Sequence, residues 1–381
     1  MIPVSWDEKP IGKIAKTSSG GTPKRDIKEF YEGGTINWFK TGELVTKYVY
    51  TSEEKITEQA LKESSAKLFP KETLLVAMYG ATIGKMSILK EDSATNQACC
   101  AILPNEKYNT EYLYYQLSFL KNKLINRGAG GAQPNISQDI IQTFPVPLPN
   151  KNEQQKIASI LSTWDKAIEL KEKLIEQKKE LKKGLMQKLL TGEVRLPGFE
   201  GEWIEYQVGE ICTLTRGRVI SKKEMEENIG IYPVYSSQTS NEGKIGSIDT
   251  YDFDGEYVTW TTDGANAGTV FYRNGKFNCT NVCGVLKLKR EDIDARYLAY
   301  VLASNTGRYV VRHGNPKLMN NIMEIIPVKI FNNFEFQKYI CDFFDIVDKE
   351  INLIEKETYE LKQQKKGLMQ LLLTGKVRVK V

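Results

Sequence analysis

Histidine and cysteine, the residues that build most zinc sites, are sparse in this chain of 381 residues. It contains one histidine, His313, and six cysteines: Cys99, Cys100, Cys212, Cys279, Cys283 and Cys341. Two of them are adjacent and two are four residues apart, with no second pair of that spacing. Because a His/Cys zinc site needs four clustered ligands, we expect no metal site. Buried free thiols in a reducing cytoplasm are the simpler interpretation, so we predict a cytoplasmic protein.

Long apolar runs and a strong net charge are also missing. No run of about 20 apolar residues occurs, so we expect no membrane span. The first ten residues lack the basic and apolar regions of a signal peptide. With 53 basic and 48 acidic residues the formal net charge is +5, which permits a polyanionic partner without requiring one. The length suggests two or three domains.

The common catalytic motifs are absent as well. Gly80-Ala-Thr-Ile-Gly84-Lys85 resembles a phosphate-binding loop, but it is one residue short, and Met86 stands where a magnesium-binding hydroxyl is required. The chain has no Gly-x-Gly-x-x-Gly fingerprint, no Asn/Asp-Pro-Pro-aromatic element of an amino-methyltransferase and no Pro-Asp…Glu-x-Lys nuclease cluster. A histidine-based triad would have to use His313, which lies in a glycine-rich loop. We therefore predict no catalytic residues.

What the chain does contain is an internal repeat. Residues 183–195 and 366–378 are identical at eleven of thirteen positions, at an offset of 183. With one residue of slack, Glu153-x-Gln155-Lys156 matches Glu335-x-Gln337-Lys338 further upstream. The segments that precede these two also match each other, but weakly and at an offset of 185. The order is thus A–B–A′–B′, with well-matched B segments and divergent A segments.

The B segments are predicted to be long helices. An apolar ladder with alternating steps of four and three residues runs through both, and the Lys, Glu and Gln between its positions favour helix. Gly192 and Gly375 suit the left-handed residue that ends a helix. Because the two stripes match, we predict that the helices pair within the chain. The predicted pairing residues are Ile157, Leu161, Trp164, Ile168, Leu185, Leu189, Ile340, Phe344, Val347, Ile351, Ile354, Leu361, Leu368 and Leu372.

Pairing with another chain is the alternative arrangement for these helices. Lys171, Lys178 and Lys182 interrupt the first apolar stripe. Their stems either carry the amines to solvent, or the lysines mark places where another subunit docks.

The A segments have the pattern of globular domains with mixed or antiparallel sheets. Short β-type runs separated by glycine-rich turns cover 73–79, 86–89, 98–103, 256–260, 268–272 and 284–288. A short helix is expected in each segment, near 110–124 and near 294–308. We predict an α+β protein with globular domains at 1–152 and 194–333 and long helices at 153–193 and 334–381.

Glycine-rich loops in both A segments carry polar side chains suited to DNA. Arg and Lys suit guanine edges and phosphates, and Asn and Gln suit adenine. Such loops are also ordinary protein surface, but here they recur at matching places in both segments. We predict DNA contacts from Lys24, Arg25, Lys40, Tyr79, Lys85, Arg127, Gln133, Asn135, Arg216, Arg218, Gln238, Thr262, Asn266, Arg312, His313, Lys317 and Asn320.

Three features together carry a resemblance to a known family. Divergent globular segments alternate with near-identical helices, and each helix ends in Lys-Gly-Leu-Met-Gln-x-Leu-Leu-Thr-Gly-x-Val-Arg. Trp6-x₅-Gly12 and Trp203-x₅-Gly209 open the globular segments. Over essentially its whole length, the chain resembles the DNA-specificity subunit of type I restriction–modification systems.

The resemblance implies a fold and a division of labour. Each globular domain would read one half of a bipartite, asymmetric site in double-stranded DNA. The helices would pair antiparallel in a pseudo-two-fold coiled coil, hold the domains apart, set the gap and dock two modification subunits. S-adenosylmethionine would belong to those adenine-N6 methyltransferase subunits, and ATP and magnesium to motor-nuclease subunits. This chain would then carry no cofactor and no active site.

Two other functions compete with this interpretation. One is an enzyme that cuts or methylates DNA by itself, and the missing motifs argue against it. The other is a coiled-coil scaffold or regulator that binds DNA or proteins outside restriction.

Overall fold

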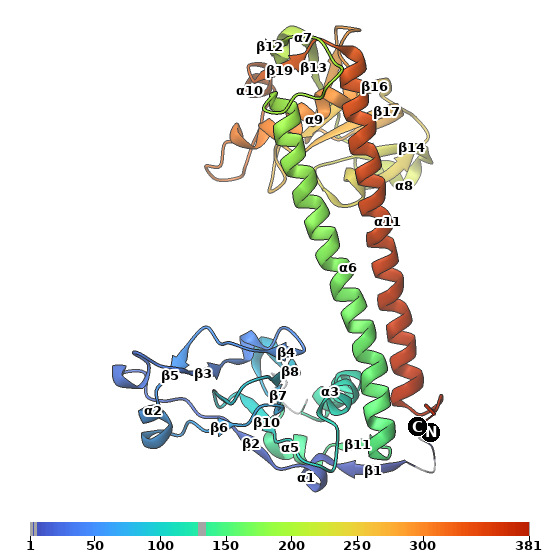
Figure 1. Cartoon of the computed structure of the whole chain (residues 1–381). Helices are drawn as coiled ribbons and strands as arrows, with labels where there is room; N and C mark the ends of the chain where they lie inside the picture. The colour runs from blue at the N-terminus through green and yellow to red at the C-terminus, as the bar shows by residue number, and fades with distance from the viewer. Residues whose placement is uncertain (1–2, 4–5, 129–134, 381) are drawn as a thin grey trace. The chain divides into compact units, whose positions relative to one another are not determined.

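A computed structural model describes residues 3, 6–128 and 135–380. The chain forms two compact units: unit 1 is Met1–Lys171 with Lys356–Val381, and unit 2 is Glu172–Glu355. Each unit combines one globular part with halves of the two long helices α6 (Lys151–Thr191) and α11 (Phe334–Leu373), drawn in green and red in Figure 1. The predicted architecture of two mixed α/β globular parts with a long helix after each is confirmed. The four-part domain boundaries stay a prediction.

Unit 1 is built on a five-stranded sheet, β2-β10-β7-β8-β4, with a four-stranded sheet β5-β3-β9-β6 and a pair β1-β11. The strands are β1 (Asp7–Pro10), β2 (Thr17–Ser19), β3 (Ile36–Phe39), β4 (Tyr48–Val49), β5 (Lys55–Ile56), β6 (Leu68–Phe69), β7 (Leu74–Ala77), β8 (Met86–Leu89), β9 (Ser93–Thr95), β10 (Cys99–Ile102) and β11 (Pro145–Leu148). The helices are α1 (Ile11–Ile14), η1 (Lys28–Phe30), η2 (Thr41–Glu43), α2 (Glu58–Glu63), η3 (Gly80–Thr82), α3 (Thr110–Phe119), α4 (Lys121–Arg127) and α5 (Gln138–Thr143).

The central strands of unit 1 read as unbroken apolar runs because both faces of the sheet are covered. All four residues of β7 are buried. Leu74 and Val76 join one apolar cluster, while Leu75 and Ala77 join another on the opposite face. Alternation with a period of two thus divides one strand between two cores.

Unit 2 has a six-stranded sheet, β13-β18-β16-β17-β14-β15, and a pair β12-β19. The strands are β12 (Trp203–Gln207), β13 (Cys212–Arg216), β14 (Ile229–Tyr235), β15 (Lys244–Ile248), β16 (Phe253–Thr261), β17 (Val270–Cys279), β18 (Cys283–Leu288) and β19 (Pro327–Phe331). The helices are α7 (Val208–Ile211), α8 (Lys222–Glu227), η4 (Ser240–Gly243), α9 (Ala295–Asn305), η5 (Thr306–Arg308) and α10 (Asn320–Glu324).

The two sheets share one strand order. β2-β10-β7-β8 in unit 1 corresponds to β13-β18-β16-β17 in unit 2, with antiparallel pairing throughout both sets. The parallel pair β3·β9 corresponds to β14·β17. The long strand β17 therefore occupies the places of both β8 and β9. The repeat seen faintly in the A segments is a repeated fold.

The long helices begin and end with equivalent contacts. Asn150 accepts a hydrogen bond from Glu153 N–H (2.9 Å) at the start of α6, and Asn333 accepts one from Phe336 N–H (2.9 Å) at the start of α11. After the helices, φ is 78° at Gly192 and 70° at Gly375. The predicted left-handed glycines are therefore confirmed, since glycine adopts this conformation without a Cβ penalty.

One detail of the sequence alignment was wrong. Gln154, not Gln155, is the counterpart of Gln337. Gln154 Oε1 accepts from Asn109 N–H, and Gln337 Oε1 accepts from Asp294 N–H, both at 2.8 Å. Both glutamines are buried, so the offset of 183 continues without slack. The Glu-x-Gln-Lys identity aligned exposed Gln155 with buried Gln337, so it does not mark equivalent places in the fold.

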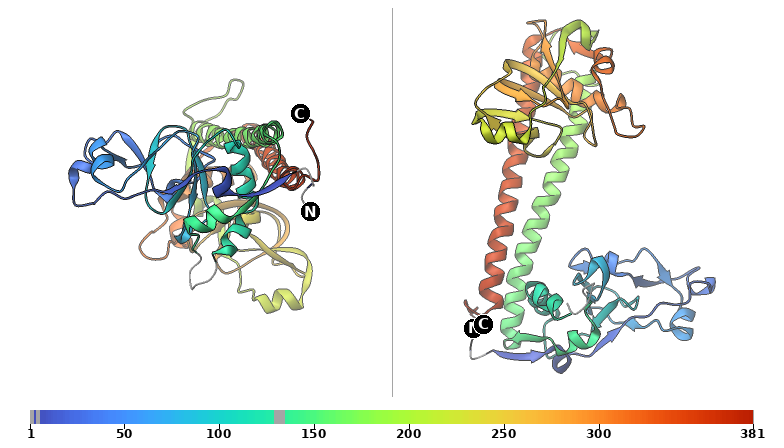
Figure 2. Two further views of the ribbon diagram at one scale, coloured as in Figure 1. Left: turned by 90° about the horizontal axis from the view of Figure 1, so that it is seen from below. Right: turned by 180° about the vertical axis from the view of Figure 1, so that it is seen from behind.

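Within each unit the two helix halves run antiparallel. In unit 1, Lys171 pairs with Glu357 (2.6 Å) and Asp165 with Lys365. The residue numbers of the partners rise along one helix as they fall along the other, so the helices are antiparallel. Helix α3 lies beside the first half of α6 (Figure 1). Pro3 and Trp6 lie against Gly375, which follows the end of α11. Both views of Figure 2 show the green helix α6 beside the red helix α11.

Unit 2 repeats this pairing with other residues. Ile175 packs with Ile351 and Ile354, and ion pairs join Lys178 to Glu350 (2.8 Å) and Lys182 to Asp348 (2.6 Å). The lysines that interrupt the apolar stripe therefore bind carboxylates of the neighbouring helix. Among the described helices, none has the length and apolar character to cross a membrane.

The predicted pairing residues differ in burial. Those that are buried are Ile157, Leu161, Ile168, Leu189, Ile340, Phe344, Ile351, Ile354 and Leu372. Those that are half-buried are Trp164, Leu185, Val347, Leu361 and Leu368. Several of them, such as Ile157 and Ile340, contact the globular part of their own unit as well as lying on a helix.

Candidate nucleic-acid interface

A tight glycine turn at residues 80–84 lies between two predicted DNA contacts of unit 1, Tyr79 and Lys85. Gly84 N–H donates to Ala77 C=O (2.9 Å), which closes the turn between β7 and β8. Just before the turn, Met78 N–H donates to Ala98 C=O (2.9 Å), and Met78 C=O accepts from Ile136 N–H (2.8 Å). The turn thereby joins two segments distant in sequence, the 96–98 loop and the segment that begins at 135.

Unit 2 repeats these bonds atom for atom. Gly268 N–H donates to Thr261 C=O (2.8 Å), and Thr262 donates to Val282 C=O (2.9 Å) while accepting from Leu318 N–H (2.9 Å). The degenerate sequence of this second turn still gives the same backbone. The reason is that only its first and fifth residues need positive φ, and both are glycine in each copy: φ is 75° and 71° in unit 1, and 92° and 86° in unit 2.

The side chains at equivalent places differ in charge. Two isolated antiparallel bridges flank the turns, Tyr79↔Asn135 in unit 1 and Asp263↔Lys317 in unit 2. Tyr79, Asn135 and Lys317 were predicted from the sequence, whereas Asp263 was missed. One backbone framework therefore presents a neutral polar pair in unit 1 and a charged pair in unit 2.

The predicted residues of unit 2 converge on this framework. Arg216 Nε donates to Asn320 Oδ1 (3.1 Å), which joins the end of β13 to α10. Asn266 Nδ2 donates to Ser237 C=O (3.1 Å), and Gln238 Nε2 donates to Lys244 C=O (2.7 Å). Four loops thus meet, at 215–218, 236–243, 262–269 and 311–320. Arg312, His313 and Lys317 are exposed in the last of them.

Buried Arg273 positions one of these four loops. Its side chain is 5% exposed, and its guanidinium lies 3.6 Å from the Tyr235 ring centroid. It donates to Glu242 C=O at 2.5 Å. Asn241 and Glu242 have φ of 50° and 51°, which is strained for residues other than glycine. Arg273 therefore holds the 240–243 turn in an otherwise unfavourable shape.

Two predicted residues of unit 2 have side-chain partners within the chain. Thr262 is fully buried, and its hydroxyl donates to Asp263 Oδ2 (2.6 Å). This geometry makes it a positioning residue and argues against direct contact with DNA. Arg218 forms ion pairs with Glu224 (2.6 Å) and Asp252 (3.1 Å), so two carboxylates share one cation.

Unit 1 has the opposite arrangement to that of Arg218: two cationic side chains bind one carboxylate. Arg25 (2.6 Å) and Lys40 (2.8 Å) both pair with Glu54. The Arg25 hydrogen bond, followed by that from Lys40, holds the pKa of the Glu54 carboxyl at about 2. The arginine also lies over the rings of Tyr31 (4.7 Å) and Trp38 (5.0 Å). Its head group is therefore fixed on three sides.

The other predicted residues of unit 1 lie on several separate segments. The Tyr79 hydroxyl donates to Gln97 C=O (2.9 Å), Lys24 and Asn135 are exposed, and Lys85 is half-buried. Arg127 lies over the Phe144 ring, 5.1 Å from its centroid. Gln133 lies outside the described residues.

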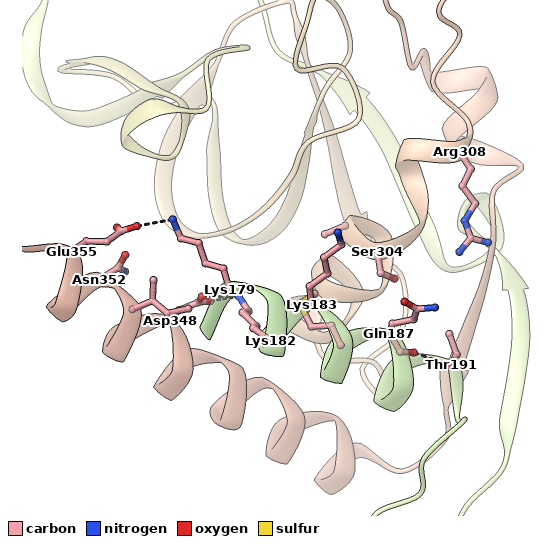
Figure 3. A pocket seen from close by; sticks show the side chains of 13 residues that line it. Lys179, Lys182, Lys183, Gln187, Thr191, Ser304, Arg308, Asp348, Asn352 and Glu355 are labelled. Atoms are coloured by element: carbon pink, nitrogen blue, oxygen red, sulfur yellow. Dashed lines mark hydrogen bonds and ion pairs between the residues drawn. The ribbon is translucent and has the colours of Figure 1, made fainter. Parts of the chain in front are cut away.

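A cavity of about 550 Å³ in unit 2 lies on the helices, apart from these loops (Figure 3). Two of its lysines are already neutralised, Lys179 by Glu355 (2.8 Å) and Lys182 by Asp348. None of the predicted DNA contacts lines it. In the described part of the chain, no cluster of three or more His, Cys, Asp or Glu side chains is arranged to hold a metal ion.

Comparison with known proteins matches this chain to one family. The profile described as "Type I restriction modification DNA specificity domain" matches residues 3–180 and 200–363. A putative type I specificity subunit of Mycoplasma pneumoniae is 38% identical over 240 residues, which is 62% of this chain and 87% of that protein. The specificity subunit of the MjaIX type I restriction enzyme of Methanocaldococcus jannaschii is 38% identical over 177 residues, 45% of this chain and 40% of its own length.

Solved structures show the same fold. The crystal structure of a type I restriction–modification S subunit from M. genitalium superposes with a TM-score of 0.65 at 18% identity, covering 97% of this chain and 96% of that one. A structure from work on complex assembly and conformational transition of the type I system gives 0.63 at 14% identity, covering 99% and 100%.

Proposed function

Because the chain belongs to the family of type I restriction–modification DNA-specificity subunits, we propose that it selects where partner subunits act on DNA. The globular part of unit 1 reads one half of a bipartite site in double-stranded DNA, and that of unit 2 reads the other half. The chain carries no catalytic step of its own. S-adenosylmethionine, ATP and magnesium belong to the modification and restriction subunits of the assembled complex.

One observation carries the proposal of two different half-sites. The two globular parts have the same hydrogen-bonded framework, yet its facing side chains are Tyr79 and Asn135 in one and Asp263 and Lys317 in the other. Base edges differ in the order of their donors and acceptors. Two identical frameworks with different donors and acceptors therefore favour two different sequences.

The helices are the proposed docking surface for two modification subunits. Leu170 and Leu353 stand at equivalent positions, at the offset of 183, and are 56% and 57% exposed. Large apolar side chains exposed at matching places on two helices favour one kind of partner bound twice. Replacing both with aspartate should prevent assembly with the modification subunits. Ser159 is an exposed polar residue of α6, so Ser159→Asp adds a charge to the helix without removing an apolar side chain. It is the matched control and should leave assembly intact.

Mapping methylated adenines tests the main proposal. The chain is expressed with the modification subunits of its own system in a host that lacks adenine methylation. We expect a bipartite, asymmetric motif whose half-site centres lie about one helical turn apart, roughly 10–11 base pairs. A contiguous or palindromic motif would contradict the proposal.

An insertion tests whether the helices set the unread gap. Four residues placed between Glu176 and Gln177 add about 6 Å to α6, close to two base-pair rises of about 3.4 Å. Four residues are close to one turn, so the apolar stripe stays nearly in phase. We expect unchanged half-sites and a gap longer by one or two base pairs. An active variant with the original gap would show that the helices are not the ruler.

A further inference from the structure

Asp263 and Lys317 face each other across the isolated bridge in unit 2. Backbone hydrogen bonds of 3.0 and 2.9 Å, from Gly264 N–H and Leu318 N–H, flank the pair on both sides. This is the non-hydrogen-bonded type of antiparallel pair, in which the two side chains share a face and lie closest together. Within the described residues they form no ion pair with each other. A carboxylate and an ammonium group therefore project from neighbouring positions on one face without binding each other, and both can meet a ligand.

The carboxylate of Asp263 is held in a fixed orientation. Thr262, which is fully buried, donates its hydroxyl to Oδ2 at 2.6 Å. Gly264, with φ of 92°, turns the chain immediately afterwards, and a Cβ there would meet no atom within 4 Å. The second oxygen, Oδ1, has no hydrogen-bond partner among the described residues. The buried Thr262 hydroxyl therefore holds the Asp263 carboxylate at the tip of an open turn, with Oδ1 available as a hydrogen-bond acceptor.

The chemistry of this pair fits one base pair best. A carboxylate accepts from the N4 amino group of cytosine, and a lysine donates to O6 and N7 of guanine. In a C·G pair these groups lie beside one another in the major groove, as the acceptor and donor do here. An unpaired carboxylate is repelled by phosphates, so a role in phosphate contact is excluded by its charge.

We propose that Asp263 and Lys317 specify a C·G pair in the half-site of unit 2, an inference that rests on the proposed function. Asp263 is the specificity-determining acceptor, and Thr262 is its positioning residue. The equivalent bridge of unit 1 reads a different base at the corresponding place. There the Tyr79 hydroxyl is already engaged by Gln97, while Asn135 is exposed and has the donor and acceptor that match adenine.

Methylome mapping with the assembled methyltransferase tests the pair. Asp263→Asn and Lys317→Met should relax the same C·G position, lowering its preference over the other base pairs by roughly 5- to 150-fold. All other positions of both half-sites should be unchanged. Asn135→Ala should instead relax one position of the other half-site. Asp249→Asn, an exposed carboxylate on the same unit, is the matched control and should leave the motif intact.

The outcomes separate this inference from the proposed function. A bipartite motif that neither Asp263→Asn nor Lys317→Met alters would overturn the inference while leaving the proposed function standing. A motif that is not bipartite even for the natural chain would overturn the proposed function. If Asp263→Asn abolishes methylation, Asp263→Glu and Lys317→Met decide: weaker preference at one shared C·G position supports the pair, and relaxation at two different positions contradicts it.

Discussion

The two units have the same sheet order but fill its core differently. In unit 2, Trp260 of β16 is paired across the sheet with Gly284 of β18. In unit 1, the corresponding cross-strand pair is Val76 of β7 and Cys100 of β10. A large residue beside glycine has been exchanged for two residues of middle size. Volume is thus conserved over the pair and not at each position, which explains why the sequences diverged while the backbones did not.

The largest predicted effect comes from breaking that pair in unit 2. A Cβ on Gly284 would lie 2.1 Å from Trp260 Cζ2, far inside van der Waals contact. Because the tryptophan is 1% exposed and has no room to move, we expect Gly284→Ala to cost about 3 kcal/mol, the upper end of the range for overpacked cores. Urea unfolding followed by tryptophan fluorescence measures the loss.

The matched change in unit 1 should be mild. Cys100→Ala removes one sulfur from a core pair that contains no large ring, so we expect a loss of about 1 kcal/mol. Trp260→Val combined with Gly284→Cys recreates the pair of unit 1 in unit 2, and should recover part of the stability lost in Trp260→Val alone. If Gly284→Ala and Cys100→Ala cost the same, the exchange of volumes has no energetic meaning.

A second prediction concerns Arg273, whose side chain braces the 240–243 turn of unit 2 through a hydrogen bond to Glu242 C=O. Replacing Arg273 with methionine removes the donor to Glu242 C=O, so the positive-φ turn at 241–242 loses its side-chain hydrogen bond from Arg273. We expect a loss of about 2 kcal/mol. The unit 2 half-site should also relax, because Gln238 lies in the same loop. Unchanged specificity in both half-sites would show that the brace serves folding alone.

A third prediction compares the two opening tryptophans. Trp6 Nε1 donates to Glu153 Oε2 (3.2 Å), a carboxylate only 1% exposed that Arg378 also binds. Trp203 Nε1 is buried and has no hydrogen-bond partner among the described residues, because Phe336 stands where unit 1 has Glu153. We expect Trp6→Phe to cost about 1 kcal/mol and Trp203→Phe to be neutral or slightly stabilising. Thermal unfolding of the two variants decides, and equal losses would contradict the comparison.

Much of the fold was predictable because the helices have a strong period and clear ends. The strands were harder: 256–260 was predicted where β16 spans Phe253–Thr261, and 268–272 where β17 spans Val270–Cys279. Outside the core, solvent-facing residues such as Glu256 and Lys276 alternate along this hairpin and hide it from a search for apolar runs. Hydrogen bonds between strands, which the sequence does not display, carry the hairpin beyond the core.

The candidate interface was predictable by residue type only. Lys317 and Asn135 were found because cations and amides suit nucleic acid. Asp263 was missed because a carboxylate is an unpromising partner for a polyanion when it is considered alone. Its place became evident only from the bridge to Lys317, which joins residues more than fifty positions apart. Thr262 was misjudged for the converse reason, since burial cannot be read from a polar residue in a glycine-rich loop.

The smallest predicted effect concerns Glu54 of unit 1. Two cationic side chains bind this carboxylate, whereas in unit 2 two carboxylates bind the single cation of Arg218. The pKa of Glu54 is lowered from 4.5 to about 2 in the folded chain, so its stabilising effect is complete above about pH 4.5 and is lost as the pH falls towards 2. Because the side chains of Glu54, Arg25 and Lys40 are 35%, 51% and 36% exposed, solvent screens their interaction, and we expect Glu54→Gln to cost at most about 1 kcal/mol at pH 7. The difference from the natural chain should shrink as unfolding is measured at pH 4 and then at pH 3. Glu53→Gln, on an exposed neighbour, should show no such trend. At neutral pH the Glu54→Gln variant also releases Arg25 and Lys40, so the dependence of DNA binding on salt should steepen. A stability difference that persists unchanged at pH 3 would show that charge is not what Glu54 contributes.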